Sequence, residues 1–520
     1  MRGKLTVTAD QPTWVSGTAA TMTILATGLG SSITAADPVI LSANISAVRA
    51  GLQLSAGTAS FVASVATLTL AATVLGAGAL GDKYGMKRMY TIGLLGTVVF
   101  GVLAAAAPNA AVLIFARAAI GVAFALQLGL SLAIINVVFP PPRRAIAISL
   151  HLGASFAVAV PMPAVGSLLV AHIGWRTGFL VAPVVALIAL VLLLRYVPET
   201  PRGARRLDVP GLLLVAAALL ATVYGLAHLQ GGLNATAIAC IAFGLAAGAG
   251  FVAYELRTPS PALDMRIFRS GAFDAAVFAG ASFNFLGGGM TILLAFYLVS
   301  VRDESSTLLG LLMAPAALLS ALGAAAAGRA AARVGGRTVL VAGLLLLLAG
   351  LLVLTRLGEH SPLWVLFAAV ALNAVGAAVA ETIEATIMLE TAPVELSGAV
   401  SAVKSGVGQA AYSLGPAVFA LIGTTVFLHS GRDKLAGAGI TDDQAREALR
   451  AAHGGPGAVG GANVLDPQRA REIVAGAQAS MVEAIHTLGW ILTAVPVVAI
   501  VVVLVLVRPR PKDTGTGDIS

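Results

Sequence analysis

The sequence predicts an all-α polytopic membrane protein, and three observations support this fold class. Of its 520 residues, 58% are hydrophobic and only 11% are charged, a composition that excludes a water-soluble globule. Apolar runs recur along the whole chain, each long enough to cross roughly 30 Å of hydrocarbon as a helix. These runs lack the alternating pattern of a membrane β-barrel, so helices must satisfy the backbone polar groups in lipid.

Fourteen apolar runs are expected to form transmembrane helices. They lie near residues 17–41, 56–80, 88–107, 111–138, 145–170, 174–196, 209–228, 234–254, 272–300, 306–330, 337–357, 362–389, 396–428 and 481–507. The first run ends in Asp37-Pro38 and lacks a small-residue cleavage site. We therefore interpret it as a retained helix rather than a signal peptide.

Basic residues predict the orientation of the chain, because short cytoplasmic loops carry an excess of Lys and Arg. With a cytoplasmic N-terminus, the short loops and tails on that side hold Arg2, Lys4, Lys83, Lys87, Arg88, Arg143, Arg144, Arg195, Arg202, Arg205, Arg206, Arg257, Arg266, Arg269, Arg329, Arg333, Arg337, Arg508, Arg510 and Lys512. The opposite short loops hold Arg49, Arg176, Arg302 and Arg356. We expect a multi-pass protein of the inner or plasma membrane with both termini cytoplasmic. We attribute the net charge of +8 to this bias rather than to nucleic-acid binding.

No signature of enzyme chemistry is found in the sequence. Its single cysteine, Cys240, lies in an apolar run, which excludes an internal disulfide and argues against a thiolate metal site. A Walker A loop, an H-E-x-x-H motif and a G-x-S-x-G motif are absent. We expect no catalytic activity, no metal and no cofactor, with an ion gradient rather than ATP as the energy source.

A charged turn separates the second and third apolar runs. Between Gly78 and Arg88 the chain reads G-A-L-G-D-K-Y-G-M-K-R. Gly85 permits a tight turn, and the Asp82 carboxylate can accept hydrogen bonds from backbone amides at a helix end. A plainer interpretation is an ordinary charged loop that caps two membrane helices.

The segment Gly328–Arg337, G-R-A-A-A-R-V-G-G-R, echoes this turn about 250 residues downstream. Aligning Gly335 with Gly85 places Ala332 on Asp82. The spacing predicts two parallel halves of six helices each, and the alternative is chance similarity between short basic loops.

The repeat divides the chain into predicted domains. They are an N-terminal six-helix bundle (1–196), a cytoplasmic linker (197–208), an inserted transmembrane helix pair (209–254), a C-terminal six-helix bundle (255–507) and a cytoplasmic tail (508–520). The second bundle includes an extracytoplasmic loop at 429–479. Helix starts at Thr441-Asp442 and Asp466-Pro467 predict a small helical hairpin there, either a lid over the outer mouth or a passive surface loop.

Two further runs carry unusual residues. Arg117 lies inside the fourth run, and a guanidinium in lipid is costly, so we expect it to face a cavity or a partner. The alternative is a side chain that extends to the membrane interface. In the fifth run, Pro161, Pro163 and Gly166 predict a kinked helix that serves as a hinge or a close-packing surface.

These motifs resemble those of the major facilitator superfamily of transporters. The turn starting at Gly78 is similar to the family pattern G-x-L-a-D-r-x-G-r-k, and F-A-R-A-A-I-G is similar to R-x-x-q-G. M-P-A-V-G-S-L-L is similar to the antiporter motif G-P-x-x-G-G-x-l, with Met162 and Ser167 as departures. The stretches A-D-P-V-I-L-S and P-S-P-A-L-D-M-R-I-F-R resemble the fourteen-helix drug:proton antiporters, and I-M-L-E-T-A-P is similar to their antiseptic-resistance (Qac-type) exporters.

The resemblance implies the major facilitator fold, in which two six-helix bundles, here with an inserted helix pair, rock about a central cavity. In that fold Gly78, Asp82, Gly85, Lys87 and Arg88 would form a conformational clamp on the cytoplasmic side.

Proton coupling requires an ionisable side chain within the membrane, and the candidates are few. Asp37 lies toward the outer end of the first run. Glu381 and Glu384 lie in the middle of the twelfth run and share a helix face, so one of them is expected to hold a proton. Lys404 follows in the next run and can approach them. The exporters that the chain resembles tend to carry an acid there, which argues against a simple preference for dicationic antiseptics.

We assign proton coupling to four residues, Asp37, Arg117, Glu381 and Glu384. The alternative is that Glu381, Glu384 and Lys404 form a static ion network that holds helices together. Lys404, Glu483 and His486 are candidates for substrate contact or a charge network, and for the last two a surface hydrogen bond is the alternative.

Together these features predict a proton-coupled antiporter that exports amphipathic drugs or small lipophilic compounds by alternating access. Its partners would be a small amphipathic molecule, protons and membrane lipid, and it would function as a monomer. The alternatives are a dedicated exporter of an endogenous lipid or natural product, and a non-transporting membrane receptor or scaffold.

Overall fold

The structure is a computed structural model that describes residues 14–54, 56–200, 208–229, 234–258, 267–268, 270–302, 306–437 and 467–508. In these segments every regular element is a helix. Each of the fourteen predicted runs overlaps one or two helical elements, and eleven helical stretches of the described chain are long and apolar enough to cross a membrane. The predicted all-α, multi-pass fold is confirmed.

The first part of the chain forms one group of helices. These are α1 (Gly17–Leu52), α2 (Ala56–Tyr84), α3 (Met86–Ala105), α4 (Ala110–Val138), α5 (Pro141–Ala159), α6 (Pro161–His172), the 3-10 turn η1 (Trp175–Leu180) and α7 (Val181–Tyr196). Two helices follow, α8 (Val209–Leu229) and α9 (Ala235–Glu255), which pack against each other. Side-chain caps start several of these helices; for example, Asn109 accepts a hydrogen bond from the Val112 amide at 3.0 Å.

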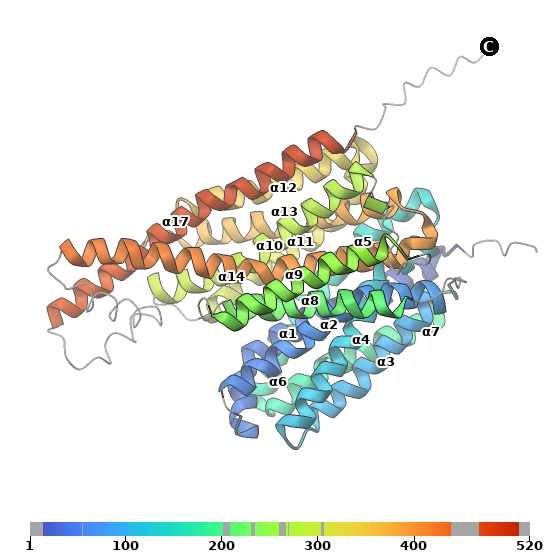
Figure 1. Cartoon of the computed structure of the whole chain (residues 1–520), viewed down its shortest axis with the longest axis horizontal. Helices are drawn as coiled ribbons and strands as arrows, with labels where there is room; N and C mark the ends of the chain where they lie inside the picture. The colour runs from blue at the N-terminus through green and yellow to red at the C-terminus, as the bar shows by residue number, and fades with distance from the viewer. Residues whose placement is uncertain are drawn as a thin grey trace, which may run out of the picture.

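The second part forms the other group. It consists of α10 (Gly271–Phe296) with a terminal π-helical turn η3 (Tyr297–Val301), α11 (Ser306–Val334), α12 (Gly336–Leu354), α13 (Leu363–Thr391), the 3-10 turn η4 (Val394–Leu396), α14 (Ser397–Gly437) and α17 (Pro467–Leu506). Figure 1 shows the two groups, blue to cyan and yellow to red, with α8 and α9 running along them. Helix α8 contacts α2 from one group and α14 from the other.

The internal repeat is present in the backbone. Gly85, between α2 and α3, has φ 97° and ψ 126°, and Gly335, between α11 and α12, has φ 86° and ψ 146°. Both glycines precede the first residue of a helix in a conformation that side-chain-bearing residues avoid. The two connections therefore share one geometry, although Ala332 stands where the first has Asp82.

We call the end of the molecule that carries these two glycine turns the motif end. The first and last described residues also lie there. The Val15 amide donates to the Val138 carbonyl at the end of α4, at 3.0 Å. Arg337, at the start of α12, donates to the Leu504 carbonyl near the end of α17, at 2.7 Å.

The two groups of helices contact each other through the backbone at glycine residues near the motif end. A Cβ on Gly78 of α2 would lie 2.5 Å from the Gly398 carbonyl oxygen of α14, so this contact requires glycine. Gly153 of α5 lies in a similar way against the Ala321 carbonyl oxygen of α11. Toward the opposite end, the ribbons of the two groups diverge (Figure 1). The structure therefore represents a state in which the halves are joined at the motif end.

The fifth predicted run is interrupted where its prolines lie. Helix α5 ends at Ala159 and α6 begins at Pro161, because neither Pro161 nor Pro163 can donate the amide bond that would continue the helix. Helix α6 packs against α1, where Gly166 leaves room for the Ile40 side chain and Ser167 bonds Asn44 at 3.2 Å.

The predicted helical hairpin in 429–479 is wrong in part. Its second helix does start at Pro467, but it is the first part of α17, which runs without a break to Leu506. Only one glycine and no further proline lie between Pro467 and Met481, so nothing stops the helix there. Helix α14 likewise continues to Gly437. The first predicted hairpin helix, most of the linker (201–207) and most of the tail (509–520) lie outside the described residues.

Substituting either turn glycine tests the shared geometry. We expect Gly85→Ala and Gly335→Ala each to lower the stability of the protein by about 1–3 kcal/mol, because a Cβ strains a backbone with positive φ. Thermal unfolding of the purified protein in detergent measures this loss. Gly336→Ala is the matched control, since a Cβ there meets only ordinary contacts with Ile383. Equal stability of all three variants would contradict the strained turn.

Candidate functional site

Asp37 and Arg117 form a buried ion pair between α1 and α4. The Arg117 Nη1 donates to Asp37 Oδ2 at 2.6 Å, and both side chains are buried. The other two guanidinium nitrogens, Nε and Nη2, have no hydrogen-bond partner among the described residues. Arg117 therefore faces a partner within the protein, as expected, and does not extend to the membrane interface.

The two glutamates and the lysine of the second half meet in one cluster. Lys404 of α14 lies between two residues of α13, with its Nζ 3.0 Å from Glu381 Oε1 and 3.6 Å from Glu384 Oε2. The contact with Glu381 is a hydrogen bond, whereas Glu384 Oε2 has no hydrogen-bond partner among the described residues. The Lys404 ammonium group therefore binds Glu381 more closely than Glu384.

Burial separates the two glutamates further. The Glu381 side chain is 25% exposed, and that of Glu384 is only 3% exposed. The Glu384 carboxyl group lies against α10 at Gly280, where any Cβ would collide with it. Glu384 is therefore the more deeply enclosed of the two and the one held less tightly by Lys404.

Asp82 joins the two halves at the motif end. Its Oδ1 accepts from the Gly398 amide at 3.1 Å, and its Oδ2 accepts from the Ala399 amide at 3.2 Å. These amides belong to the first turn of α14, so a carboxylate from α2 caps a helix of the other half. The neighbouring Asn136 of α4 donates to Ser397 at 2.7 Å and adds a buried polar contact between the halves.

The other residues of the charged turn hold the first half together. The Lys87 backbone amide donates to Thr200 Oγ1 at 3.1 Å, and its side chain pairs with Glu199 at 3.5 Å. Arg88 is exposed, and Gly85 supplies the turn. Of the five residues predicted to form a clamp, Gly78 and Asp82 contact the opposite half.

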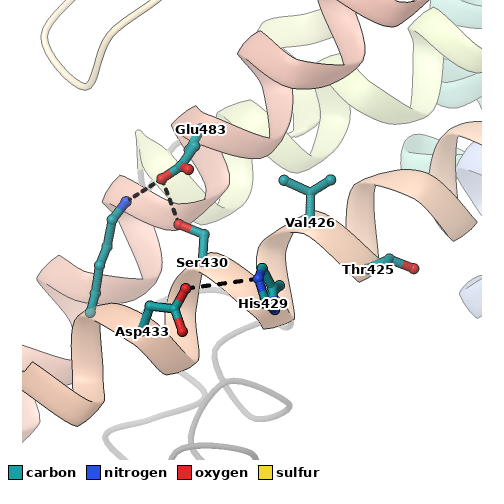
Figure 2. Close-up of a pocket in the computed structure, with 7 residues that line it drawn as sticks. Thr425, Val426, His429, Ser430, Asp433 and Glu483 are labelled. Atoms are coloured by element: carbon teal, nitrogen blue, oxygen red, sulfur yellow. Dashed lines mark hydrogen bonds and ion pairs between the residues drawn. The ribbon is translucent and has the colours of Figure 1, made fainter.

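Glu483 and His486 lie at the end opposite the motif end and have different partners. Glu483 of α17 accepts from Ser430 at 2.6 Å and pairs with Lys434 of α14 at 2.9 Å. Figure 2 shows these contacts in a cavity of about 450 Å³. The His486 ring bonds the Leu357 carbonyl at 2.6 Å instead. The Glu483 contacts tie α14 to α17 in an exposed ion pair, which contributes little stability.

Comparison with known proteins identifies the family. Residues 20–416 match the sequence profile described as the Major Facilitator Superfamily, which is more than half of the chain. The chain belongs to the major facilitator superfamily. It is a membrane transporter of that superfamily, and the family resemblance noted in its motifs is confirmed.

Several similar major facilitator proteins are named as exporters. The chain is 27% identical over 430 residues to the tetracenomycin C resistance and export protein of Streptomyces glaucescens, covering 80% of each chain. It is 30% identical over 422 residues to the multidrug efflux pump LfrA of Mycolicibacterium smegmatis, covering 79% of this chain and 81% of LfrA. These two relatives are named as an antibiotic resistance and export protein and as a multidrug efflux pump.

Solved structures show the same fold. The proton:xylose symporter XylE superposes with a TM-score of 0.60 at 14% identity, covering 94% of this chain and 96% of XylE. The human organic anion transporter MFSD10 superposes with a TM-score of 0.58 at 16% identity, covering 94% of this chain and all of that one. Similarity at this level of identity establishes the fold alone.

The sequence alone did not indicate three features of the site: two contacts and one buried residue. It did not pair Asp37 with Arg117, because they lie 80 residues apart and pairing needs the tertiary fold. It did not place Asp82 on α14. It also overlooked His151, a buried histidine of α5, although any ionisable residue within an apolar run is a signal of function.

Removing one charge of the buried Asp37–Arg117 pair should lower the stability of the protein more than removing both charges. Asp37→Asn leaves the Arg117 charge unpaired inside the protein, so we expect a loss of about 3–5 kcal/mol in stability. The double variant Asp37→Asn/Arg117→Met removes both charges and is expected to recover much of that loss. Thermal unfolding in detergent measures the two variants against the wild type. A double variant that is at least as unstable as Asp37→Asn alone would contradict a direct pair.

The Asp82 cap predicts a shift in conformation. Asp82→Ala removes the acceptor of two α14 amides, so we expect the joined state to lose about 0.5–2 kcal/mol, a factor of about 2 to 30 in its population. Spin labels on exposed Arg88 and Glu395, in a Cys240→Ser background, report the distance between the halves. Lys83→Ala, which leaves the Asp82 carboxylate in place, is the control. An unchanged distance distribution in Asp82→Ala would contradict the capping role.

Proposed function

We propose that this transporter is a proton-coupled antiporter that exports amphipathic drugs or small lipophilic compounds by alternating access. Its similarity to named multidrug and antibiotic exporters supports the substrate class. The observation that carries the coupling is the cluster of Lys404, Glu381 and Glu384, because a transporter coupled to protons needs a titratable side chain enclosed between its helices.

Counting the charges in the cluster indicates which of the two glutamates carries a proton. Lys404 neutralises one carboxylate, and its hydrogen bond selects Glu381. An ionised Glu384 would then be an uncompensated charge in a low dielectric, which is costly. In the present state Glu384 therefore carries a proton. When this proton leaves, one negative charge remains, and a substrate with a single positive charge can balance it.

The contacts between the halves support the alternating cycle. In the state described, α2 and α14 are joined through Asp82 and through the Gly78–Gly398 backbone contact. These contacts depend on a few hydrogen bonds and on van der Waals packing, so they can form and break as the halves rock. The substrate path would then open at the motif end when they separate.

We propose that the protein lies in the inner or plasma membrane and that its motif end faces the cytoplasm. The first and last described residues lie at that end, and basic side chains concentrate there. Lys83, Lys87 and Arg88 follow α2, Arg143 and Arg144 begin α5, and Arg333 and Arg337 flank the second glycine turn. This distribution is the one expected of cytoplasmic loops. We further propose that one chain, surrounded by lipid, suffices for transport.

A dedicated exporter of one natural product is the second candidate. The similarity to the tetracenomycin C resistance and export protein and to the puromycin resistance protein of Streptomyces alboniger favours it. Efflux of ethidium alongside several unrelated antibiotics supports the multidrug function, whereas efflux restricted to one antibiotic class supports the dedicated one.

Efflux from membrane vesicles tests the coupling. Wild-type vesicles loaded with a proton gradient should move ethidium against its concentration gradient, and an uncoupler should stop this movement. We expect Glu384→Gln to abolish gradient-driven transport, because glutamine can neither bind nor release the proton, while facilitated exchange of ethidium persists. Asn284→Ala, which alters a neighbouring polar residue on α10 that does not titrate, is the control. Gradient-driven efflux that is undiminished in the folded Glu381→Gln/Glu384→Gln variant would rule the pair out.

A further inference from the structure

The two halves meet along two lines of helix contact. Helices α2 and α14 form one, which we call the first seam, and α5 and α11 form the other, the second seam. Because α2 precedes the turn at Gly85 and α11 precedes the turn at Gly335, the internal repeat relates the two seams to each other. One helix packs against both members of each seam in an equivalent way, α4 at the first seam and α13 at the second.

The inserted pair α8–α9 breaks this symmetry. Helix α8 packs against both α2 and α14, whereas among the described helices only α13 packs closely against both α5 and α11. Helix α4 carries the buried Arg117 and lies on the inner side of the first seam. Helix α8 does not pack closely against α4, and its Leu213 and Leu220 are exposed, so it covers the membrane side of that seam (Figure 1).

Helix α8 follows α2 through the membrane. Near the motif end its Leu212 meets α2 at Gly76, where a Cβ would lie 3.9 Å from Leu212 Cδ2. Further along, Tyr224 packs on Leu68 and Ala71 of α2. The 21 residues of α8 span about 31 Å as an α-helix. This length matches the hydrocarbon layer, so α8 covers the first seam across its depth.

Helix α9 holds α8 in place without joining either half. The two backbones approach closely at Gly244, where a Cβ would lie 2.9 Å from the Ala218 carbonyl oxygen. The Tyr254 hydroxyl donates to Asp208 at 3.1 Å and closes the pair at its other end. Among the described helices, α9 packs closely against α8 alone. The pair is therefore a tightly packed cover rather than a part of either bundle.

Small residues form the second seam. A Cβ on Gly153 of α5 would lie 3.0 Å from the Ala321 carbonyl oxygen and 3.3 Å from the Ala325 Cβ of α11. A Cβ on Gly328 of α11 would lie 2.6 Å from the Ala145 carbonyl oxygen of α5. The two helices therefore touch through backbone and methyl groups, which interact by van der Waals contact alone.

The two seams also differ in their polar bonds. Among the described residues, no hydrogen bond or ion pair joins α5 to α11. The Ser149 hydroxyl and the Arg329 guanidinium donate to carbonyls of their own helices, at 2.9 Å and 3.1 Å. At the first seam, in contrast, Asp82 accepts from two amides of α14. The second seam can therefore open without breaking a hydrogen bond between its helices.

We propose that the inserted pair seals the first seam against the membrane, and that substrate dissolved in the lipid enters at the motif end through the second seam. Amphipathic compounds concentrate in the bilayer because their apolar part leaves water. Helix α13 lies behind the second seam and carries Glu381 and Glu384, so this route leads toward the titratable cluster. When Gly78 and Gly398 separate, α8 stays along α2 and keeps lipid out of the gap.

Ala326 and Leu213 are matched positions for a test. Ala325 of α11 faces α5, and the next residue, Ala326, is exposed beside the second seam. Leu212 of α8 faces α2, and the next residue, Leu213, is exposed beside the first seam. A tryptophan at 326 would narrow the entrance, whereas a tryptophan at 213 would lie on the outer surface of the cover. Because both positions are exposed, both variants are expected to fold.

This entry route rests on the proposed function, and reconstituted vesicles distinguish the two. The probe is bisbenzimide, an amphipathic dye that fluoresces in the bilayer and not in water, so its loss of fluorescence under a proton gradient reports export from the lipid. We expect Ala326→Trp to slow this loss several-fold and Leu213→Trp to match the wild type. The Kd of bisbenzimide for the purified protein in detergent should stay unchanged in both variants, because a narrowed entrance alters a rate and not an equilibrium.

Each outcome bears on one of the two proposals. Wild-type vesicles that move neither ethidium nor bisbenzimide under the gradient would refute the proposed function itself. Vesicles that move ethidium but leave bisbenzimide in the bilayer would refute only entry from the lipid. Equal rates in Ala326→Trp and the wild type, or a slower rate in Leu213→Trp alone, would refute the role of the second seam. A changed Kd in Ala326→Trp would indicate a structural effect and would overturn the proposal as well.

A second measurement uses the wild-type protein and depends on no variant. A photoreactive azide of ethidium is illuminated in wild-type vesicles, and the labelled residues are mapped by mass spectrometry, with excess ethidium as the competitor. We expect competed labels on α5 or α11 near the motif end and none on α8 or α9. Competed labels on α8 or α9, or their absence from both α5 and α11, would contradict the proposed route.

Discussion

The structure depends on the neutralisation of charges that are enclosed between helices. In a low dielectric an unpaired charge is costly, so each enclosed ionic group must find a partner or a proton. Arg117 meets Asp37 at 2.6 Å, and this pair is complete. Lys404 meets two carboxylates, so the cluster is neutral only while it holds one proton or one additional positive charge. The Asp37–Arg117 pair stabilises the fold of its half. The cluster of Lys404, Glu381 and Glu384 can couple to transport because its net charge depends on whether a proton is bound.

Helix α14 connects the incomplete cluster to the contact between the halves. Its first turn receives the Asp82 carboxylate at Gly398 and Ala399, and Lys404 follows five residues later, about 7.5 Å along the helix axis. A rigid helix moves as a unit, so release of the cap at the motif end also displaces the ammonium group from its surroundings. Closure of the path and the preferred position of the proton are thereby coupled through one element.

Much of the fold follows from the sequence because membrane helices are specified locally. Length and hydropathy predict each run, and Gly85 and Gly335 predict matching turns through their conformational freedom. Proline predicts the break between α5 and α6 for the same local reason. The hairpin prediction failed in part because the helix that starts at Pro467 was expected to end before the last apolar run. No residue between them stops a helix, so it continues to Leu506.

The candidate site was predictable only in its parts. Glu381 and Glu384 share a face because they are three residues apart on one helix, and Asp37 and Arg117 are conspicuous in apolar runs. Their partners, in contrast, come from other helices, and nothing in local spacing fixes which helix lies opposite. His151 shows the same limit, since its hydroxyl partners Thr27 and Ser31 on α1 depend on packing between helices that are distant in the sequence.

The central claim is that one enclosed carboxyl group, Glu384, exchanges its proton for substrate. Calorimetric titration of ethidium into the purified protein, repeated in buffers of different ionisation enthalpy, counts the protons released on binding. The account predicts about one proton released by the wild type and none by Glu384→Gln. Ethidium binding with no proton release in the wild type, or with the same release in Glu384→Gln, would contradict it.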